Sequence, residues 1–532
     1  MPNDAKHRVV VLGGGFGGVF TAKHLRRRAG PNVDVLLISR NNFFVFQPLL
    51  PEIAAGSINV EDGVTPLRRF LRGVAVLVAE IRDIDLGTKT VLASPQRAGE
   101  IRAVPYDQLV IALGQVVDLS RTPGLAERAL VVKGATDAFR IRNQVLGCLE
   151  QADATTEPRR RRSLLTFVVI GGGFTGVETI GEVQELIRKS LRYYPNIRPD
   201  EIRTILIQHG TRILPELPEH LAAYAADHLS RRGIEIRLNS AVEAVTPAGV
   251  ETDSGPPIDA ETIVAAIGNA PSPLIASLPV TLDRGRIAVD RSMRVQGHED
   301  VWALGDDAHI PLGDPSGSDV AYAPPLAQFA VREAKVLARN ILAHIGGRPL
   351  EPFVYRSMGT MASLGGRRGV AEIMGVRVTG LPAWVTWRLF YLGLLPGFST
   401  RVRVATDWLL DLVLRRGIAE IRAAQPTSRQ LRFFAGDLVI EPGVDPGGLY
   451  VVTGGLFEVR ASPNDGGVSP PRRLGPGGHF GTTLSGSANS TDAWVSAGED
   501  STAYFVGKDD LQRLAMVSRL IERQSDHNTA SA

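Results

Sequence analysis

Two glycine-rich fingerprints of the same kind constrain the fold of this chain more than any other feature. The first, VVVLGGGFGG, carries Gly13, Gly15 and Gly18, and the second, FVVIGGGFTGVE, carries Gly171, Gly173 and Gly176. Each follows a Val- and Ile-rich stretch and opens a helical one, so the glycines permit a tight turn, close helix packing and the approach of a pyrophosphate. One copy alone could be a plain glycine-rich turn. Two copies at domain spacing predict an α/β chain that binds two dinucleotides.

Composition narrows the class of protein. A chain of 532 residues exceeds the size of one hydrophobic core, so we expect three or more structural units. The formal net charge of +3 is too small to indicate a nucleic-acid partner. The single cysteine, Cys148, excludes an internal disulfide, a cysteine-rich metal site and a redox-active cysteine pair. We expect no metal site.

The ends of the expected strands carry candidate binding residues. About 20 residues past each fingerprint, where such sites normally offer a carboxylate to ribose hydroxyls, stand Ser39 and Gln208. Serine offers a weaker hydrogen bond. A neutral Gln208 could admit the 2′-phosphate of NADPH, or it could bind the same hydroxyls of NADH. Asp306 follows a third strand end, over 301–304, where an acid can bind a ligand hydroxyl.

Seven motifs, taken in order, resemble the type II NADH:quinone oxidoreductases, also called alternative NADH dehydrogenases. They are GGGFGG, FQPLLPEIAAG (46–56), YDQLVIALG (106–114), GGGFTGVE, RILPEL (212–217), ALGDDA (303–308) and LAQFA (326–330), within a resemblance that covers about residues 8 to 420. The resemblance implies that the first fingerprint binds FAD and the second NADH or NADPH. It implies electron transfer from NAD(P)H through FAD to a membrane quinone, without proton pumping.

The same resemblance assigns site residues. Asp306 would hold the ribityl chain of the flavin, and Gln328 would be a catalytic residue on the quinone side. The family's second glutamine in this motif is Arg332 here, and its usual lysine is Met358, which makes quinone affinity a question. The expected cofactor-binding residues are Gly13, Gly15, Phe16, Gly17, Gly18, Ser39, Gln47, Gly114, Gly171, Gly173, Gly176, Gln208, Gly268, Gly305, Asp306 and Ala327.

Glu178 is the second expected catalytic residue. It lies on the first turn of the helix that the second fingerprint opens. The family places an acid near the nicotinamide and flavin here, so Glu178 could position the nicotinamide or relay a proton. An acid in a first helical turn is also favoured simply by the helix dipole.

We expect a discontinuous FAD-binding domain over 1–118 and 283–352, with an NAD(P)H-binding domain over 119–282 between its parts. Residues 353–424 form a membrane-anchoring segment, 426–515 a small β-roll and 516–532 a tail. The arginine-rich stretch 153–163 is expected to be an exposed linker.

The segment 381–422 has the composition of an interfacial anchor. It holds three of the five tryptophans, and Pro396 with Gly397 divides it into two short amphipathic helices. Trp384, Trp387 and Tyr391 share one helical face, which we expect to enter the membrane interface. The alternative is a helix pair packed on the chain's own core or on a dimer partner. The resemblance favours the anchor.

Short β-type runs separated by glycine turns follow, and they resemble a cyclic-nucleotide-binding-like domain. The scaffold glycines match, but the ribose glutamate is replaced by Thr482 and the phosphate arginine by Thr491, beside Asp492. A conventional cyclic nucleotide is therefore not the expected ligand. A docking or oligomerisation role, or a different ligand, fits better.

The expected protein is a peripheral flavoenzyme at the cytoplasmic face of the cell membrane. One alternative is a soluble NAD(P)H diaphorase or electron-carrier reductase. Another is a redox-sensing regulatory flavoprotein that acts through its C-terminal domain. A homodimer is possible under each of these interpretations.

Overall fold

The structure, a computed structural model, consists of two compact units. The first combines residues 1–77 and 105–421, and the second combines residues 78–104 and 422–532. The structure describes residues 6–95, 101–313, 321–357, 359–421, 429–433, 435–461, 471–481, 493–508 and 510–511. Met358, Thr482, Thr491, Asp492 and the expected tail lie outside the described residues.

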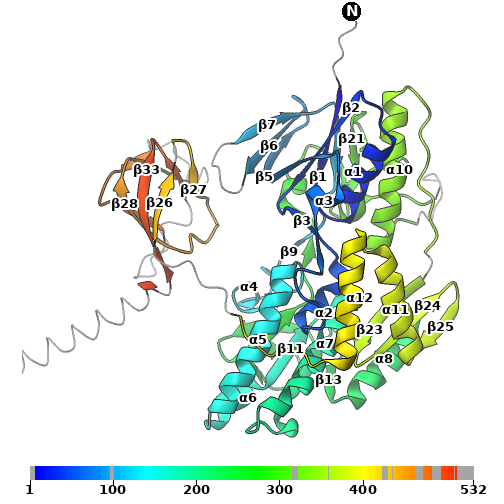
Figure 1. Ribbon diagram of the computed structural model, residues 1–532, viewed down its shortest axis with the longest axis vertical. Coiled ribbons are helices and arrows are strands. Elements are labelled where there is room, and N and C mark those ends of the chain that lie inside the picture. The colour runs from blue at the N-terminus through cyan, green and yellow to red at the C-terminus, as the bar shows by residue number, and fades with distance from the viewer. Residues whose placement is uncertain are drawn as a thin grey trace, which may run out of the picture. The chain divides into compact units, whose positions relative to one another are not determined.

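The first unit contains a parallel sheet that begins with the first fingerprint. Strands β1 (His7–Leu12), β2 (Val33–Ser39), β8 (Gln108–Ile111) and β21 (Val301–Ala303) lie in the order β21-β8-β1-β2. Val9 to Leu12 are fully buried, as expected for a parallel strand covered on both faces. Helices α1 (Phe16–Arg28) and α10 (Ala327–Ile345) pack against each other beside this sheet (Figure 1).

A second parallel sheet begins with the second fingerprint. Its order is β10-β17-β11-β12-β13, and its strands are β10 (Leu130–Val131), β11 (Thr166–Ile170), β12 (Arg203–Ile207), β13 (Ile234–Arg237) and β17 (Thr262–Ala265). Its helices are α5 (Ala135–Ala154), α6 (Pro158–Leu164), α7 (Phe174–Ser190) and α8 (Glu219–Arg231). The chain thus repeats the strand, glycine turn and helix that the fingerprints predict.

The expected linker over 153–163 is wrong. The chain forms α6 there, with Glu157 accepting hydrogen bonds from the first free amides of the helix. Arg161 pairs with Glu201 across 2.7 Å, so one arginine of the run is used to dock the helix.

Smaller elements connect these layers. They are β3 (Phe43–Val45), η1 (Gln47–Leu49), α2 (Leu50–Ala54), β4 (Val64–Pro66), α3 (Leu67–Phe70), β9 (Val116–Val117), α4 (Leu125–Arg128), η2 (Leu191–Tyr193), η3 (Pro199–Glu201), β14 (Val242–Thr246), β15 (Gly249–Thr252), β16 (Ile258–Asp259), β18 (Asn269–Ala270), α9 (Pro273–Ala276), β19 (Leu282–Asp283), β20 (Arg286–Ala288), η4 (Gly305–Asp307) and β22 (Ala308–His309).

The first unit ends in an antiparallel sheet and two helices. The sheet consists of β23 (Gly359–Gly365), β24 (Arg368–Ile373) and β25 (Val376–Thr379). Helices α11 (Gly380–Leu394) and α12 (Phe398–Val413) follow side by side (Figure 1). They are separated at Pro396 and at Gly397, whose φ of +88° favours glycine, so the expected break is confirmed.

The second unit is rich in β-structure. Two four-stranded sheets, β26-β33-β28-β31 and β27-β32-β29-β30, enclose a core that includes Phe457 and Phe480. Their strands are β26 (Arg429–Phe433), β27 (Leu438–Ile440), β28 (Gly448–Gly454), β29 (Phe457–Ala461), β30 (Arg472–Leu474), β31 (His479–Gly481), β32 (Ala493–Ala497) and β33 (Ser501–Gly507). This unit also contains β6 (Thr90–Pro95), β7 (Arg102–Pro105) and most of β5 (Ala75–Asp85).

Candidate active site

One cavity of about 450 Å³ brings the separate sequence motifs together. Both fingerprint helices, the carboxyl ends of strands from both parallel sheets, the start of α10 and the C-terminal helices contribute to its wall. The expected site residues in its lining are Phe16, Gln47, Glu178, Asp306, Ala327 and Gln328. Residues that come from five places in the sequence therefore face one space.

The first glycine turn is shaped to receive a phosphate. Gly13 has a φ of +109°, and a Cβ there would lie 1.9 Å from the carbonyl oxygen of Ala112. A Cβ at Gly18 would lie 2.0 Å from the carbonyl oxygen of Gly13, which keeps α1 close to the turn. Gly17 packs on Leu304 instead. Gly15 is the helix N-cap, has open space beside it and leaves the first helical amides without a side-chain cap. These free amides fit a pyrophosphate.

The second glycine turn repeats the arrangement. Gly171 has a φ of +110°, and a Cβ at Gly176 would lie 1.8 Å from the carbonyl oxygen of Gly171. Gly173 is an N-cap with open space and no side-chain cap. Gly268 has a φ of +86° and accepts a hydrogen bond from the amide of Asp118 across 2.7 Å. Gly268 thereby ties the end of the second sheet to the segment that leaves the first.

Acids follow β21 at the edge of the cavity. Asp307 is buried and accepts a hydrogen bond from the amide of Gly114 across 2.9 Å, and burial raises its pKa to about 7. Glu333 accepts from the amide of Gly305 across 2.8 Å, and burial raises its pKa to about 7 as well. These two buried acids fix the loop at Gly305 and at Asp307, and Asp306, which stands between those two loop residues, lines the cavity.

The carboxylate of Asp306 is free to bind a ligand. Within the described residues it has no hydrogen-bond or ion-pair partner. Burial raises its pKa, and the positive charges of Lys133 and Arg286 partly offset that effect. A partly buried carboxylate without a partner is costly unless a ligand hydroxyl satisfies it. Together with the uncapped amides at Gly15, this donor and acceptor set fits the pyrophosphate and ribityl chain of FAD.

The two ribose positions are partly occupied by contacts within the chain. Gln208 Oε1 accepts a hydrogen bond from the amide of Gly172 across 2.8 Å, and Nε2 donates to the carbonyl of Arg212 across 3.4 Å. Ser39 is buried and donates to the carbonyl of Asn41 across 2.8 Å. Gln208 thus braces its glycine turn, whereas the hydroxyl of Ser39 is used by the loop that follows β2.

Glu178 lies in the cavity wall, and its pKa is raised. Its Oε1 accepts hydrogen bonds from the amide of Ser363 across 2.9 Å and from the indole of Trp387 across 3.1 Å. Burial raises the pKa of Glu178 to about 8, because these two bonds offset only part of the cost of desolvating the charge. The carboxyl group can therefore hold a proton near neutral pH.

Gln328 is held at the start of α10 by several bonds. Nε2 donates to Ser357 Oγ across 3.2 Å and to the carbonyl of Gly359 across 3.4 Å, and Oε1 accepts from the hydroxyl of Tyr355 across 3.3 Å. Arg332 donates to the carbonyl of Gln328 across 2.7 Å and lies 4.4 Å from the centre of the Tyr355 ring. Both Gln328 and Arg332 line the cavity.

The tryptophans of the C-terminal helices point inward. Trp384, Trp387 and Trp408 are at most 8% exposed, so the expectation that they enter a membrane interface is wrong. Their positions follow from buried acids beneath the helices. Glu52 Oε2 accepts from the indole of Trp408 across 2.7 Å, and Glu52 Oε1 pairs with Arg388 across 2.8 Å. Desolvated indole and carboxylate groups satisfy each other here.

The outer face of these helices is apolar instead. On α11, Val385 and Leu389 are 41% and 64% exposed, and on α12 Leu409 and Val413 are 62% and 80% exposed. The other exposed apolar side chains of the pair are Leu381, Phe398, Val402, Leu410 and Leu412. We call this set the outer apolar face. Among the described residues, no helix has both the length and the apolar character needed to cross a membrane.

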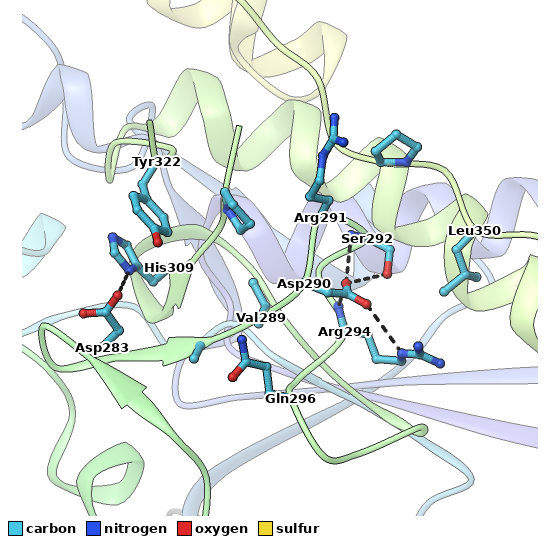
Figure 2. A pocket seen from close by; sticks show the side chains of 13 residues that line it. Asp283, Val289, Asp290, Arg291, Ser292, Arg294, Gln296, His309, Tyr322 and Leu350 are labelled. Atoms are coloured by element: carbon cyan, nitrogen blue, oxygen red, sulfur yellow. Dashed lines mark hydrogen bonds and ion pairs between the residues drawn. The ribbon is translucent and has the colours of Figure 1, made fainter. Parts of the chain in front are cut away.

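A second cavity, of about 600 Å³, lies beside β20 and β22 (Figure 2). Several of its polar groups contact one another: His309 Nδ1 lies 2.7 Å from Asp283 Oδ2, and Asp290 binds Ser292 and pairs with Arg294. Its lining shares no described residue with the expected active site. The second cavity is therefore separate from the expected active site.

Several residues of the site have no counterpart in the sequence-based expectations. Glu52 lies inside the FQPLLPEIAAG motif, and Asp307 directly follows the expected Asp306. Both belong to motifs quoted above, but the sequence did not indicate that their side chains are buried. Glu333 and Lys133 stand outside the quoted motifs. Only the fold brings Lys133 into the cavity, at the end of β10.

The comparisons with known proteins agree with this geometry. A family model described as pyridine nucleotide-disulphide oxidoreductase matches residues 7–334, and one described as the NDH2 C-terminal domain matches residues 358–417. The type II NADH:quinone oxidoreductase Ndh of Mycobacterium tuberculosis is 33% identical over 441 residues, which cover 80% of this chain and 92% of the relative. The chain belongs to the type II NADH:quinone oxidoreductases. It is a flavoprotein that transfers electrons from NADH to quinone.

Further matches extend over the same part of this type II oxidoreductase. The internal alternative NAD(P)H-ubiquinone oxidoreductase A1 of Arabidopsis thaliana is 30% identical, over 78% of this chain and 86% of the relative. The structure of NDH2 from Plasmodium falciparum in complex with NADH shares the fold, with a TM-score of 0.71 and 22% identity, over 78% of this chain and all of that chain.

The C-terminal extension of this type II oxidoreductase matches a model described as the cyclic nucleotide-binding domain, over residues 430–518. The β-rich fold that the sequence predicts there is therefore confirmed. The disulphide chemistry in the name of the first matching model does not extend to this chain, because Cys148 is its only cysteine. Burial raises the pKa of Cys148 to about 11, so the thiol is unreactive as well as single.

Proposed function

We propose that the chain oxidises NADH or NADPH through an FAD held between its two parallel sheets and passes the electrons to a membrane quinone. One observation carries this proposal: a single cavity is lined by both fingerprint helices, by Asp306 and by the Gln328 segment. A donor site, a flavin site and an acceptor site share that space. The proposed reaction does not pump protons, as the resemblance to the type II oxidoreductases implies.

The residues divide the work of binding. The amides at Gly15 would hold the flavin pyrophosphate, Asp306 its ribityl chain, and Gln47 and Ala327 would lie against it. The amides at Gly173 would hold the nicotinamide nucleotide, with Gln208 and Gly268 beside it. When bound, FAD supplies the ability to accept a hydride and to release two electrons to a quinone. The protein's part is to orient the partners and to manage protons.

Glu178 is the proposed proton-holding group. Both of its hydrogen bonds go to Oε1, so Oε2 is the oxygen that can carry a proton. A pKa of about 8 leaves the group protonated in most molecules at pH 7 and able to exchange a proton at modest cost. Quinone reduction consumes protons, so a carboxyl group in this state, in the wall of the cavity, is suited to supply one.

The quinone would enter beside the C-terminal helices. Phe390, Tyr391 and Leu394 of α11 line the cavity together with Gln328 and Arg332. The outer apolar face on the same helices would rest in the membrane interface, which places the cavity next to the lipid phase where quinones dissolve. The enzyme would thus be peripheral, on the cytoplasmic side where NADH is produced.

Gln208 suggests that both nicotinamide nucleotides are accepted. A carboxylate at this position would repel a 2′-phosphate, whereas a neutral amide does not. Its bond to the amide of Gly172 uses one acceptor lone pair and leaves the position uncharged.

Steady-state oxidation of NADH and of NADPH by detergent-purified protein, with and without a short-chain quinone, tests the proposal. We expect quinone-dependent turnover with either nucleotide. Turnover with soluble dyes but not with quinone would instead indicate a diaphorase, and binding of nucleotides without turnover would indicate a sensor. Anaerobic addition of NADH should bleach the flavin in a single turnover.

A further inference from the structure

Lys133 is a cation in the active-site cavity that no sequence motif accounts for. It follows β10, at the carboxyl edge of the second parallel sheet, and its side chain lines the cavity. Within the part of the chain that the structure describes, its ammonium takes part in no hydrogen bond or ion pair. Burial lowers its pKa, and the charges of Asp306 and Asp307 oppose that effect.

The other cations of the cavity lining are already used by the protein. Arg332 donates to the carbonyl of Gln328 and covers the Tyr355 ring. Arg401 donates to the carbonyl of Leu395 and to that of Gly393, across 2.8 Å in each case. Lys133 therefore differs from both arginines, because its ammonium has no such acceptor within the described residues.

Lys133 and Asp306 carry opposite charges, face the same cavity and are not joined by an ion pair. Each influences the pKa of the other, so they lie within electrostatic range. Two partly buried, unpaired charges are costly when they stay apart. A polar ligand in the space between the two side chains would give the ammonium an acceptor and the carboxylate a donor. Asp306 is the acid that we assign to the flavin, so the ligand between them is the flavin.

We propose that Lys133 is the counter-ion of the reduced flavin and so sets how readily NADH reduces it. This inference rests on the proposed function. A hydride brings two electrons and one proton to the flavin, so the flavin gains one negative charge while the nicotinamide gains one positive charge. A fixed cation in a partly desolvated site stabilises such a charge more strongly than water does. Lys133 binds the oxidised flavin, which lacks that charge, less strongly.

The experiment compares the flavin midpoint potential of the wild-type holoenzyme with that of Lys133→Met, by equilibration with a redox dye under anaerobic conditions. We expect the equilibrium constant for flavin reduction to fall about tenfold, a shift of about 30 mV toward more negative potential for a two-electron couple. Flavin content, measured after heat release, should change little. Lys133→Gln serves as a second uncharged variant if Lys133→Met fails to fold.

Two control variants separate a direct effect from a general one. Lys133→Arg keeps the charge and should retain most of the wild-type potential. Arg286 also influences Asp306 but donates to the carbonyls of Ala308 and Ala323, so Arg286→Gln should shift the potential much less. An equal shift in Arg286→Gln would mean that the potential depends on the total positive charge near the site and not on Lys133 in particular, and would overturn the assignment.

Two further results would overturn the assignment of Lys133 to the flavin. An unchanged potential in Lys133→Met overturns the inference, and an unchanged potential with weaker binding of NADH assigns the lysine to the nicotinamide nucleotide instead. Failure of the proposed function has a different signature, because the wild-type protein would then carry no FAD or would not be bleached by NADH.

Discussion

The indole of Trp387 donates a hydrogen bond to Glu178, across 3.1 Å, from a helix that lies more than 200 residues further along the chain. This bond therefore joins α7, the helix of the nicotinamide fingerprint, to α11, one of the two helices that carry the outer apolar face. The carboxylate is the better acceptor, so this bond stabilises the charged form of Glu178 and keeps its pKa lower than burial alone would.

The first prediction concerns proton supply. The protonated fraction of Glu178 falls as the pH rises through about 8, so the wild-type rate of quinone reduction should decline above that pH. Glu178→Gln cannot carry the proton and should be slower, without this decline. Trp387→Phe removes a bond to the charged form, so the decline should move to higher pH. Identical pH profiles in all three proteins would remove Glu178 from proton supply. Stopped-flow kinetics across pH 6 to 10 provides the measurement.

The second prediction concerns flavin retention. Asp306→Asn keeps the shape of the side chain and removes its charge, so we expect the affinity for FAD to fall by roughly 1.5 to 3 kcal/mol, the usual contribution of a hydrogen bond to a charged group. Equilibrium dialysis of the apoprotein with FAD measures the change. Asp283→Asn, at the second cavity, is the control and should keep full affinity. Equal affinity in both variants would show that Asp306 does not bind the flavin.

The third prediction concerns the choice of nucleotide. Gln208→Glu preserves the size of the side chain and adds a charge that repels a 2′-phosphate. The ratio of kcat/KM for NADPH to that for NADH should fall about tenfold, which corresponds to about 1.4 kcal/mol. Lower activity with both nucleotides in equal proportion would mean instead that the substitution disturbs the Gly172 turn.

The fourth prediction separates the two halves of the reaction. Gln328→Leu removes the amide that meets Tyr355 and Ser357 at the start of α10. Quinone reduction should slow by an order of magnitude or more, roughly the loss of one hydrogen bond in the transition state. Bleaching of the flavin by NADH should stay near the wild-type rate. A variant that slows only the bleaching would place Gln328 on the nicotinamide side.

The fifth prediction concerns the membrane. Leu389 is 64% exposed on the outer apolar face, so Leu389→Glu should weaken binding to vesicles by about 1.5 kcal/mol or more, about tenfold. Leu282, 36% exposed on β19, is the matched control, and Leu282→Glu should bind as the wild type does. Removal of residues 426–532 should leave binding intact. Vesicle sedimentation measures each case, and failure of the wild type to sediment would refute the peripheral location.

The sequence predicted the parts of the fold that depend on local pattern. Parallel strands buried on both faces are apolar throughout, and glycine turns need glycine, so β1 and β11 with their turns could be placed from the residues alone. The predicted helical face of Trp384, Trp387 and Tyr391 exists as well. Its direction could not be predicted, because a helical pattern shows which residues share a face and not which face is covered.

The burial of several charged side chains could not be predicted either, because a helical pattern does not show which of its faces is covered. Glu178, Glu182 and Glu185 recur along α7 at a spacing typical of a solvated helix face, yet all three are at most 7% exposed. Glu182 pairs with Arg416 across 3.6 Å, and Glu178 accepts a hydrogen bond from Trp387, so the partners of these two acids come from the far end of the first unit. Arg161 is a similar case, since its partner Glu201 is what turns an apparent linker into a docked helix.

The pairing of Glu182 with Arg416 has a consequence for how the chain is made. During synthesis, α7 leaves the ribosome more than 200 residues before Arg416, which at roughly 5 to 20 residues per second is a delay of ten seconds or more. Through that interval the nascent nucleotide-binding domain carries an acid whose counter-charge does not yet exist. A buried acid without its partner costs several kcal/mol. We therefore expect the nascent nucleotide-binding domain to bury a charged Glu182 only after Arg416 emerges, when more than 100 of the 532 residues are still to be made.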